Sequence, residues 1–338
     1  MKRVTSLVII CSVFILVAAG LILLATGTWN GAKHKDSNLP DELFLPSKET
    51  EMVTHDALDS ISVRSCFSRD PAHEVEPPAW LSRSVLDPLE RHAAARRPIP
   101  DPAEFPGLVK VEQILSRSGN QRNHCAATRI AEHWFLTANH CVQMRGTSRT
   151  VVDMLIIAPQ GDVALDDAQI IPVKAGMCHA AWYSPTGKFD DDIALLYVED
   201  TKQLSAVDVP SLDIFEPHMP AHLLTGGVFA GWGKNGDNRF LQSGSARITE
   251  VGETFILTDN RGEFSPCVGD SGGPLYVDKE GAPHVVGVLS SVTRDGCPPY
   301  DKAFYMRLKT YADWIQTVMK VCVQDDKFVC DIVGDVWR

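Results

Sequence analysis

Residues 266–275 read Pro-Cys-Val-Gly-Asp-Ser-Gly-Gly-Pro-Leu. This stretch places Ser271 between an aspartate and two glycines, with a cysteine four residues before the serine. Glycine supplies the positive-φ conformations that tight turns need, so a glycine-rich serine turn alone can be only a turn. The whole pattern is far more specific than a turn, and it indicates a reactive serine.

Two other segments carry polar groups suited to the same chemistry. Residues 125–141 read Cys-Ala-Ala-Thr-Arg-Ile-Ala-Glu-His-Trp-Phe-Leu-Thr-Ala-Asn-His-Cys, which puts His140 beside a cysteine. Residues 190–196 read Asp-Asp-Asp-Ile-Ala-Leu-Leu, an acidic run that leads directly into an apolar strand. Taken singly, a histidine is usually a surface or core residue and an acidic run is usually a solvated loop. Their value lies in their combination with the serine segment.

Composition places the chain among ordinary globular proteins. It has 338 residues, 44% hydrophobic and 22% charged, which is typical of a packed protein and not of a disordered one. Its net charge of −11 lacks the basic character that binds phosphate backbones, so we expect no nucleic-acid partner.

Short β-rich runs separated by Gly, Pro and Asp turns begin near residue 108, and their spacing favours an all-β sandwich or barrel. One helix is expected near the end, at residues 311–321, where apolar residues recur at helical spacing. The clearest predicted strands are residues 151–158, 193–198, 228–231 and 284–289.

Over roughly residues 98–320 the chain resembles the chymotrypsin-like serine proteases, in which the active residues occur in the order His, Asp, Ser. Trp134 and the Leu-Thr-Ala at 136–138 precede His140 as in that family. Residues 228–233, Val-Phe-Ala-Gly-Trp-Gly, resemble the start of its second barrel, and residues 311–315 resemble its closing helix. The resemblance implies an all-β fold of two six-stranded antiparallel β-barrels followed by a C-terminal helix.

The resemblance also implies the roles of the polar residues. A serine hydroxyl is a weak nucleophile that needs an adjacent base, and a neutral imidazole has a suitable pKa. Ser271 is expected to be the nucleophile and His140 the acid/base, while Asp192 holds the imidazole tautomer and stabilises the imidazolium. The N–H groups of Gly269 and Ser271 are expected to form the oxyanion hole. Asp190 and Asp191 are expected to face solvent.

The resemblance also implies which residues line the primary specificity pocket. Ser265 is expected at its base, where trypsin-like members carry an aspartate, so a preference for Lys or Arg is not predicted. Open pockets in the family have glycine at the positions of Val292 and Ala303. We therefore expect a shallow pocket that prefers small aliphatic side chains, lined also by Pro266 and Ser290.

The nine cysteines sort into groups. Cys11 lies in an apolar window near the N-terminus. By resemblance, Cys125 pairs with Cys141 and Cys267 pairs with Cys297. Four cysteines then remain, and four allow three pairings, which the sequence leaves open: Cys66, Cys178, Cys322 and Cys330.

The N-terminus carries an export signal. Residues 7–25 form a 19-residue window whose only plainly polar member is Ser12. As a helix it would span roughly 28 Å, close to the hydrocarbon thickness of a bilayer. It is expected to be a retained transmembrane signal anchor, with a cleaved signal peptide as the alternative. Either way the protein is extracytoplasmic, membrane-anchored or secreted, and it can form disulfides.

Four segments are expected along the chain: a signal anchor or signal peptide at 1–29, a proline-rich stem or pro-segment at 30–97, the protease domain at 98–320 and a tail at 321–338. Family members become active when a new N-terminus inserts beside the aspartate before the serine, here Asp270. The nearest candidate site, residues 96–100 with the sequence Arg-Arg-Pro-Ile-Pro, matches poorly. We nevertheless expect a zymogen and an activating protease.

The sequence therefore predicts an exported serine endopeptidase that acts on proteins or peptides through an acyl-enzyme intermediate. The alternative is a catalytically silent homologue that acts as a binding or adaptor protein. A metal-dependent hydrolase is disfavoured, because the chain has no compact ligand set such as His-Glu-x-x-His. No metal or cofactor is expected.

Overall fold

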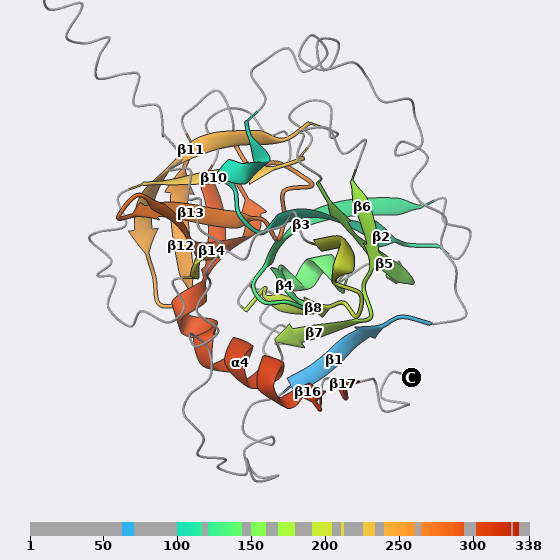
Figure 1. Cartoon of the computed structure of the whole chain (residues 1–338). Coiled ribbons are helices and arrows are strands. Elements are labelled where there is room, and N and C mark those ends of the chain that lie inside the picture. The colour runs from blue at the N-terminus through green and yellow to red at the C-terminus, as the bar shows by residue number, and fades with distance from the viewer. Residues whose placement is uncertain are drawn as a thin grey trace, which may run out of the picture. The chain divides into compact units, whose positions relative to one another are not determined.

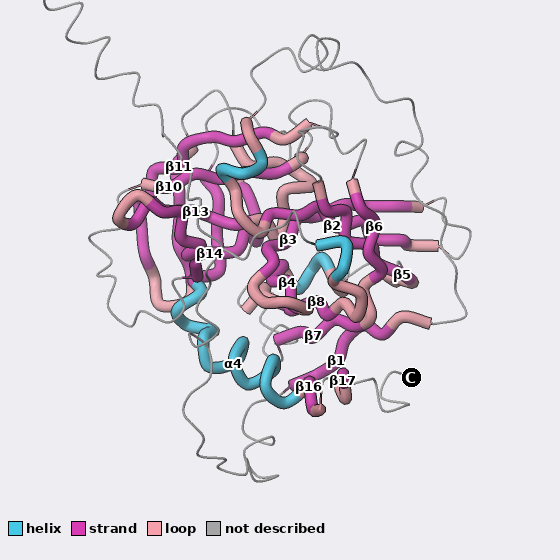
Figure 2. The backbone as a smooth tube through the Cα atoms, in the orientation of Figure 1, coloured by secondary structure: helices cyan, strands magenta, loops and turns pink. Residues whose placement is uncertain are grey.

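The computed structural model describes twelve parts of the chain, all within one compact unit, residues 49–338. In the ribbon and tube views their strands gather into two bodies, with one long helix beside them (Figures 1 and 2). The described residues are 63–70, 100–116, 121–143, 150–159, 168–179, 191–204, 211–212, 226–233, 240–260, 265–293, 302–325 and 327–330.

The first sheet contains eight strands among the described residues. They are β1 (Val63–Ser68), β2 (Leu108–Ile114), β3 (Arg122–Arg129), β4 (Trp134–Thr137), β5 (Asp153–Ala158), β6 (Gln169–Pro172), β7 (Ala175–His179) and β8 (Ala194–Tyr197). Their order is β1-β7-β8-β4-β3-β2-β5-β6. Only Val173 and Lys174 separate β6 from β7, so one bent segment pairs with β5 on one side and with β8 on the other. That segment closes a ring of six strands, as predicted.

The second sheet contains seven described strands. They are β9 (Ser211–Leu212), β10 (Gly227–Gly231), β11 (Gln242–Val251), β12 (Phe255–Asp259), β13 (Pro274–Lys279), β14 (Ala282–Val292) and β15 (Lys302–Arg307). β13 pairs with both β10 and β14, which closes a second ring of six antiparallel strands. β9 is an added strand that pairs parallel with β14, so the expectation of purely antiparallel pairing does not hold there.

β1 changes the predicted segment boundaries. It lies inside the predicted stem, yet it pairs antiparallel with β7 over Val63–Ser68 (Figure 1). Cys66 of β1 also forms a disulfide with Cys178 of β7. Part of the predicted stem is therefore a strand of the first sheet, a pairing that the short apolar patches of that segment do not reveal.

The predicted helix is α4 (Leu308–Val321), which begins three residues earlier than expected. Its buried residues recur at helical spacing and form one apolar face: Leu308, Tyr311, Trp314, Ile315 and Val318. The predicted tail contains a hairpin of β16 (Val323–Gln324) and β17 (Lys327–Phe328), and the disulfide Cys322–Cys330 joins the two ends of this hairpin. Phe328 stacks on Tyr197 of β8 with ring centroids 4.4 Å apart, so this hairpin covers the first barrel.

Three single 3₁₀ turns complete the described elements: η1 (Pro102–Glu104), η2 (Asn139–Cys141) and η5 (Lys202–Leu204). In the parts of the chain that the structure describes, no helix is long and apolar enough to cross a bilayer. The predicted anchor at residues 7–25 lies outside the described residues, as does the predicted cleavage region at 96–99.

Candidate active site

The first barrel brings His140 and Asp192 together. The end of β4 pairs with the start of β8, with Thr137 opposite Ala194. His140 follows β4 in the turn η2, and Asp192 lies just before β8. Because the strands are antiparallel, His140 and Asp192 lie at the same end of the β4–β8 pair. The apolar strand after the acidic run is completely buried, which fixes Asp192 in place.

Two hydrogen bonds tie these residues to each other. His140 Nδ1 donates to Asp192 Oδ2 at 2.7 Å, and the His140 backbone N–H donates to Asp192 Oδ1 at 2.8 Å. Asp192 is fully buried, while the His140 side chain is 28% exposed. Burial disfavours a charged imidazole, but the charge of Asp192 and its hydrogen bond outweigh that effect, so the pKa of His140 is raised. With Nδ1 committed as a donor, Nε2 of the neutral imidazole is left as a proton acceptor.

The side chain of Ser290 also forms a hydrogen bond with Asp192. The Ser290 hydroxyl donates to Asp192 Oδ2 at 2.6 Å, and Ser290 is 3% exposed. The sequence placed Ser290 in the specificity pocket, whereas its side chain points to the carboxylate instead. Nothing in the local sequence indicates this contact, since the two residues are 98 positions apart.

Main-chain bonds hold the serine loop to both barrels, through Ala126 of β3 in the first and Leu289 of β14 in the second. The Ala126 N–H donates to the Ser271 carbonyl at 2.7 Å, and the Gly272 N–H donates to the Leu289 carbonyl at 2.8 Å. Gly272 has φ +81°, and a Cβ there would lie 2.2 Å from Thr137 Oγ1 and 2.3 Å from the Ala126 carbonyl oxygen. Only glycine fits this position, and its absent side chain lets the loop lie close to β3 and β4.

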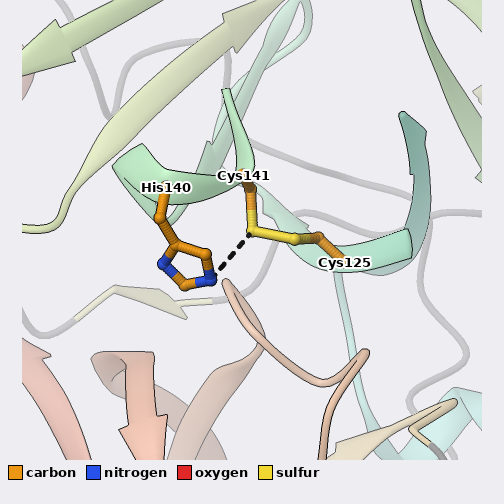
Figure 3. Close-up of side chains that lie close together, drawn as sticks. All are labelled: Cys125, His140 and Cys141. Carbon is orange, nitrogen blue, oxygen red and sulfur yellow. Dashed lines mark hydrogen bonds between the residues drawn. A yellow bond between two sulfur atoms is a disulfide. The ribbon is translucent and has the colours of Figure 1, made fainter. Parts of the chain in front are cut away.

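One disulfide lies beside both the histidine and the serine. Cys125 and Cys141 are bonded, as predicted, and Cys141 Sγ lies 3.8 Å from His140 Nε2 (Figure 3). The same sulfur lies 3.6 Å from the Ser271 carbonyl oxygen. Cys125, His140 and Cys141 form a compact cluster, but sulfurs joined in a disulfide provide no thiolate to bind a metal.

Ser271 and His140 thus lie against the same sulfur, and among the described residues no hydrogen bond joins Ser271 Oγ to His140 Nε2. Such bonds are often long in proteases without substrate and tighten when substrate binds.

The predicted oxyanion hole has two available donors. Gly269 has φ +104°, and among the hydrogen bonds between described residues neither its N–H nor that of Ser271 has an acceptor. The residue between them, Asp270, turns inward. Its carboxylate accepts bonds from the N–H of Gly233 at 2.7 Å and of Cys267 at 2.9 Å.

Two of the predicted pocket residues, Val292 and Ala303, are paired in the second barrel. Ser265, Pro266 and Ala303 are buried, and Val292 is directly opposite Ala303 in the β14–β15 register. Val268, next to Gly269, is apolar and 38% exposed.

Of the other residues singled out in the sequence, some lie in described parts of the chain and some do not. Asp191 is partly exposed, and its carboxylate lies 3.8 Å from His179 Nδ1. Asp190 lies outside the described residues. Cys267 is disulfide-bonded, and its predicted partner Cys297 also lies outside them.

Comparisons with known proteins agree with this geometry. The family model described as Trypsin matches residues 107–315. Human chymotrypsin-like elastase family member 1 is 29% identical over 229 residues, covering 60% of this chain and 84% of the relative. Human chymotrypsin-like elastase family member 3B is 28% identical over 244 residues, covering 64% and 84%.

A solved structure of HL collagenase has the same fold, with a TM-score of 0.51, 23% identity and coverage of 66% of this chain and 96% of that one. The chain belongs to the trypsin family, that is, to the chymotrypsin-like serine proteases. It is a serine endopeptidase.

Proposed function

We propose that this endopeptidase cleaves peptide bonds with Ser271 as nucleophile, His140 as acid/base and Asp192 as the carboxylate that orients the imidazole. The observation that carries the proposal is the fully buried Asp192, which accepts bonds from His140 Nδ1, the His140 N–H and Ser290 Oγ. A buried carboxylate bonded to one imidazole nitrogen leaves the other to act on the serine.

The chemistry proceeds in two halves. Ser271 Oγ attacks the substrate carbonyl carbon while His140 Nε2 takes its proton, and the resulting oxyanion accepts bonds from the N–H groups of Gly269 and Ser271. The C–N bond then breaks, and the imidazolium returns the proton to the leaving amine. Water, deprotonated by His140, hydrolyses the acyl-enzyme and releases the second product.

We also propose a preference for small aliphatic side chains before the scissile bond. Val292 and Ala303 face each other across the β14–β15 ladder, so their side chains reduce the depth of the pocket. Ser265, the residue expected at the base of the pocket, carries no charge. The names of the elastase relatives fit this preference.

The disulfides support the proposal that the enzyme works outside the cytosol. Cys66–Cys178, Cys125–Cys141 and Cys322–Cys330 are each formed in the structure. Such bonds persist in oxidising compartments. Anchoring by residues 7–25 and activation by cleavage near 96–100 remain predictions.

The direct test uses a serine-directed phosphonate probe on the full chain, with Ser271→Ala as the matched control. We expect one label per active chain, located on Ser271, and none in the control. If folded wild-type protein takes no label, whether uncut or processed, the chain is a silent homologue and the proposal is wrong.

The pocket is tested separately with peptides that differ only in the residue before the scissile bond. Ala or Val should give the highest kcat/KM. Fastest cleavage after Arg or Phe would contradict the proposed preference while leaving the mechanism intact.

A further inference from the structure

The middle of β2 carries a buried cation that the mechanism above does not use. Lys110 is 1% exposed, and all seven residues of β2 are buried. Lysine is almost never fully buried unless its charge is balanced, because removing an ammonium group from water is costly. The position of this side chain relative to the active site is therefore informative.

Lys110 lies on the face of β2 that packs against the serine loop. Its neighbour across the β2–β3 ladder is Ala126, and directly opposite residues project on the same face. Ala126 binds the Ser271 carbonyl through its N–H, and its Cβ lies 3.4 Å from the place a Cβ on Gly273 would take. The strand pair that carries Lys110 thus contacts residues 271–273 directly.

The loop contains a buried carboxylate, Asp270, which is 4% exposed. Besides its two backbone hydrogen bonds, it is enclosed by glycines, since a Cβ on Gly231 or Gly233 would lie 2.2 Å from one of its carboxylate oxygens. Burial raises the pKa of Asp270 to about 6, against the lowering effects of the Cys267 and Gly233 N–H groups and of the charge on Lys110. Among the described residues no ion pair joins Lys110 directly to Asp270, so the effect of its charge on the carboxylate acts over a distance longer than 4.0 Å.

Three other titratable groups lie in this region. His124 on β3 lies against Gly269, where an added Cβ would be 2.3 Å from its Nε2, and its imidazole carries positive charge only when it is protonated. The pKa of the Tyr305 hydroxyl on β15 is raised by burial and by the charge of Asp270. Glu112, two residues along β2, has a pKa raised by burial and lowered in part by Lys110 and Arg122. Neither Tyr305 nor Glu112 can supply positive charge to Asp270.

We propose that Lys110 is a positioning residue for the oxyanion loop, and that its ammonium group balances the Asp270 carboxylate from within the uncut chain. The inference rests on the proposed function of Gly269 and Ser271. Asp270 separates these two donors, so an ionised Asp270 that holds the Gly233 and Cys267 N–H groups also holds the loop. In the family that charge is expected from a new N-terminus, for which this sequence offers only a poor match at 96–100.

The first experiment measures the phosphonate labelling rate of Ser271 against pH in three variants. Lys110→Met removes the charge but keeps a long apolar side chain, and Lys110→Arg restores the charge. Lys174→Met is the control, because Lys174 is a partly exposed lysine paired with Glu199 at 3.2 Å on the protein surface.

In Lys110→Met we expect the rate at pH 7 to fall by about 10²-fold, the size expected when an oxyanion donor is lost. The acid limb of the profile should also move to higher pH, because Asp270 loses the cation that lowers its pKa. Lys110→Arg should recover most of the rate, and Lys174→Met should match the wild type. A purely structural loss would lower the fraction of active protein without moving the acid limb. If Lys110→Met labels like the wild type over the whole pH range, the inference is wrong.

The second experiment needs no variant and covers the case in which Lys110→Met fails to fold. Wild-type chain labelled at Ser271 is reduced, which opens Cys66–Cys178, and its mass is measured. We expect labelled chains that are unbroken from β1 through Ser271. Label found only on chains cut between β1 and η1 would overturn the inference and support the predicted zymogen. Complete absence of label would count against the proposed function itself.

Discussion

The two sides of the active site are held in different ways. The histidine side, from β4 to η2 together with the start of β8, is fixed by a disulfide, by the buried carboxylate Asp192 and by apolar strands. The serine side, residues 265–273, contains no strand before Pro274 and is fixed by main-chain bonds, glycines and the inward-facing Asp270. Chemistry on the first side depends on side-chain pairing, and on the second it depends on backbone geometry.

The largest effect is expected from breaking the pairing on the histidine side. Asp192→Asn keeps the size of the side chain but removes its charge and favours the wrong imidazole tautomer. We expect kcat to fall about 10⁴-fold with little change in KM, as is typical when the orienting carboxylate is lost. Steady-state kinetics on a peptide substrate measure this. A loss below tenfold would show that Asp192 does not orient His140.

The serine side should respond next, to a change in backbone geometry alone. Gly272→Ala adds a single methyl group at φ +81°, against Thr137 Oγ1 and the Ala126 carbonyl. The loop must shift, so we expect a loss of about 10²–10³-fold in kcat, the range for a damaged oxyanion hole. Gly281→Ala is the matched control, because Gly281 has φ +83° but nothing within 4 Å of an added Cβ. Equal losses in both variants would contradict the close-packing argument.

Ser290 tests a contact between the histidine side and the second barrel, since it lies on β14 and donates to Asp192. Ser290→Ala removes one hydrogen bond to a charged group, which is worth roughly 1.5–3 kcal/mol. We expect kcat to fall about 10- to 100-fold and a Ser290→Thr variant to retain more activity. If Ser290→Ala has unchanged kcat and altered KM, the residue acts on substrate in the pocket and not on Asp192.

The smallest effect on chemistry is expected at the disulfide Cys66–Cys178, which lies beside the histidine side, since Cys178 is opposite Ala194 at the start of β8. Replacing both cysteines with serine frees β1, and the loss of a native disulfide typically costs about 2–4 kcal/mol in free energy of unfolding. Denaturant unfolding should show this loss, whereas kcat of the folded enzyme should stay within about twofold, because the hydrogen bonds of β1 among the described residues do not include His140, Asp192 or Ser271. A large fall in kcat without a fall in stability would contradict this expectation and show that β1 helps to hold the active-site residues in position.

Sequence motifs marked both sides of the site, and the serine segment was the more specific of the two. The Cys125–Cys141 bond was predicted by resemblance to the family, and the strands near 153–158, 194–197 and 227–231 follow from apolar runs bounded by turns. Long-range contacts left no such local signal. The pairing of β1 with β7 and the bond from Ser290 to Asp192 join residues about 100 positions apart.

Lys110 illustrates the same limit within one strand. β2 reads Leu-Val-Lys-Val-Glu-Gln-Ile, and a strand that alternates apolar and polar residues is ordinarily half exposed. In the fold, however, both faces of β2 are covered, and Lys110 and Glu112 are buried. Which face a strand presents to a distant loop depends on the whole fold, and no local pattern reveals it.

The central claim is that Ser271 becomes acylated during turnover. A rapid-mixing assay with an activated ester of a small aliphatic acyl group, followed by peptide mass spectrometry, tests this most directly. We predict a burst of alcohol product equal to one per active chain, with the acyl group on the peptide that contains Ser271 and no burst in Ser271→Ala. An acyl group on another residue, or turnover that persists in Ser271→Ala, would contradict the account.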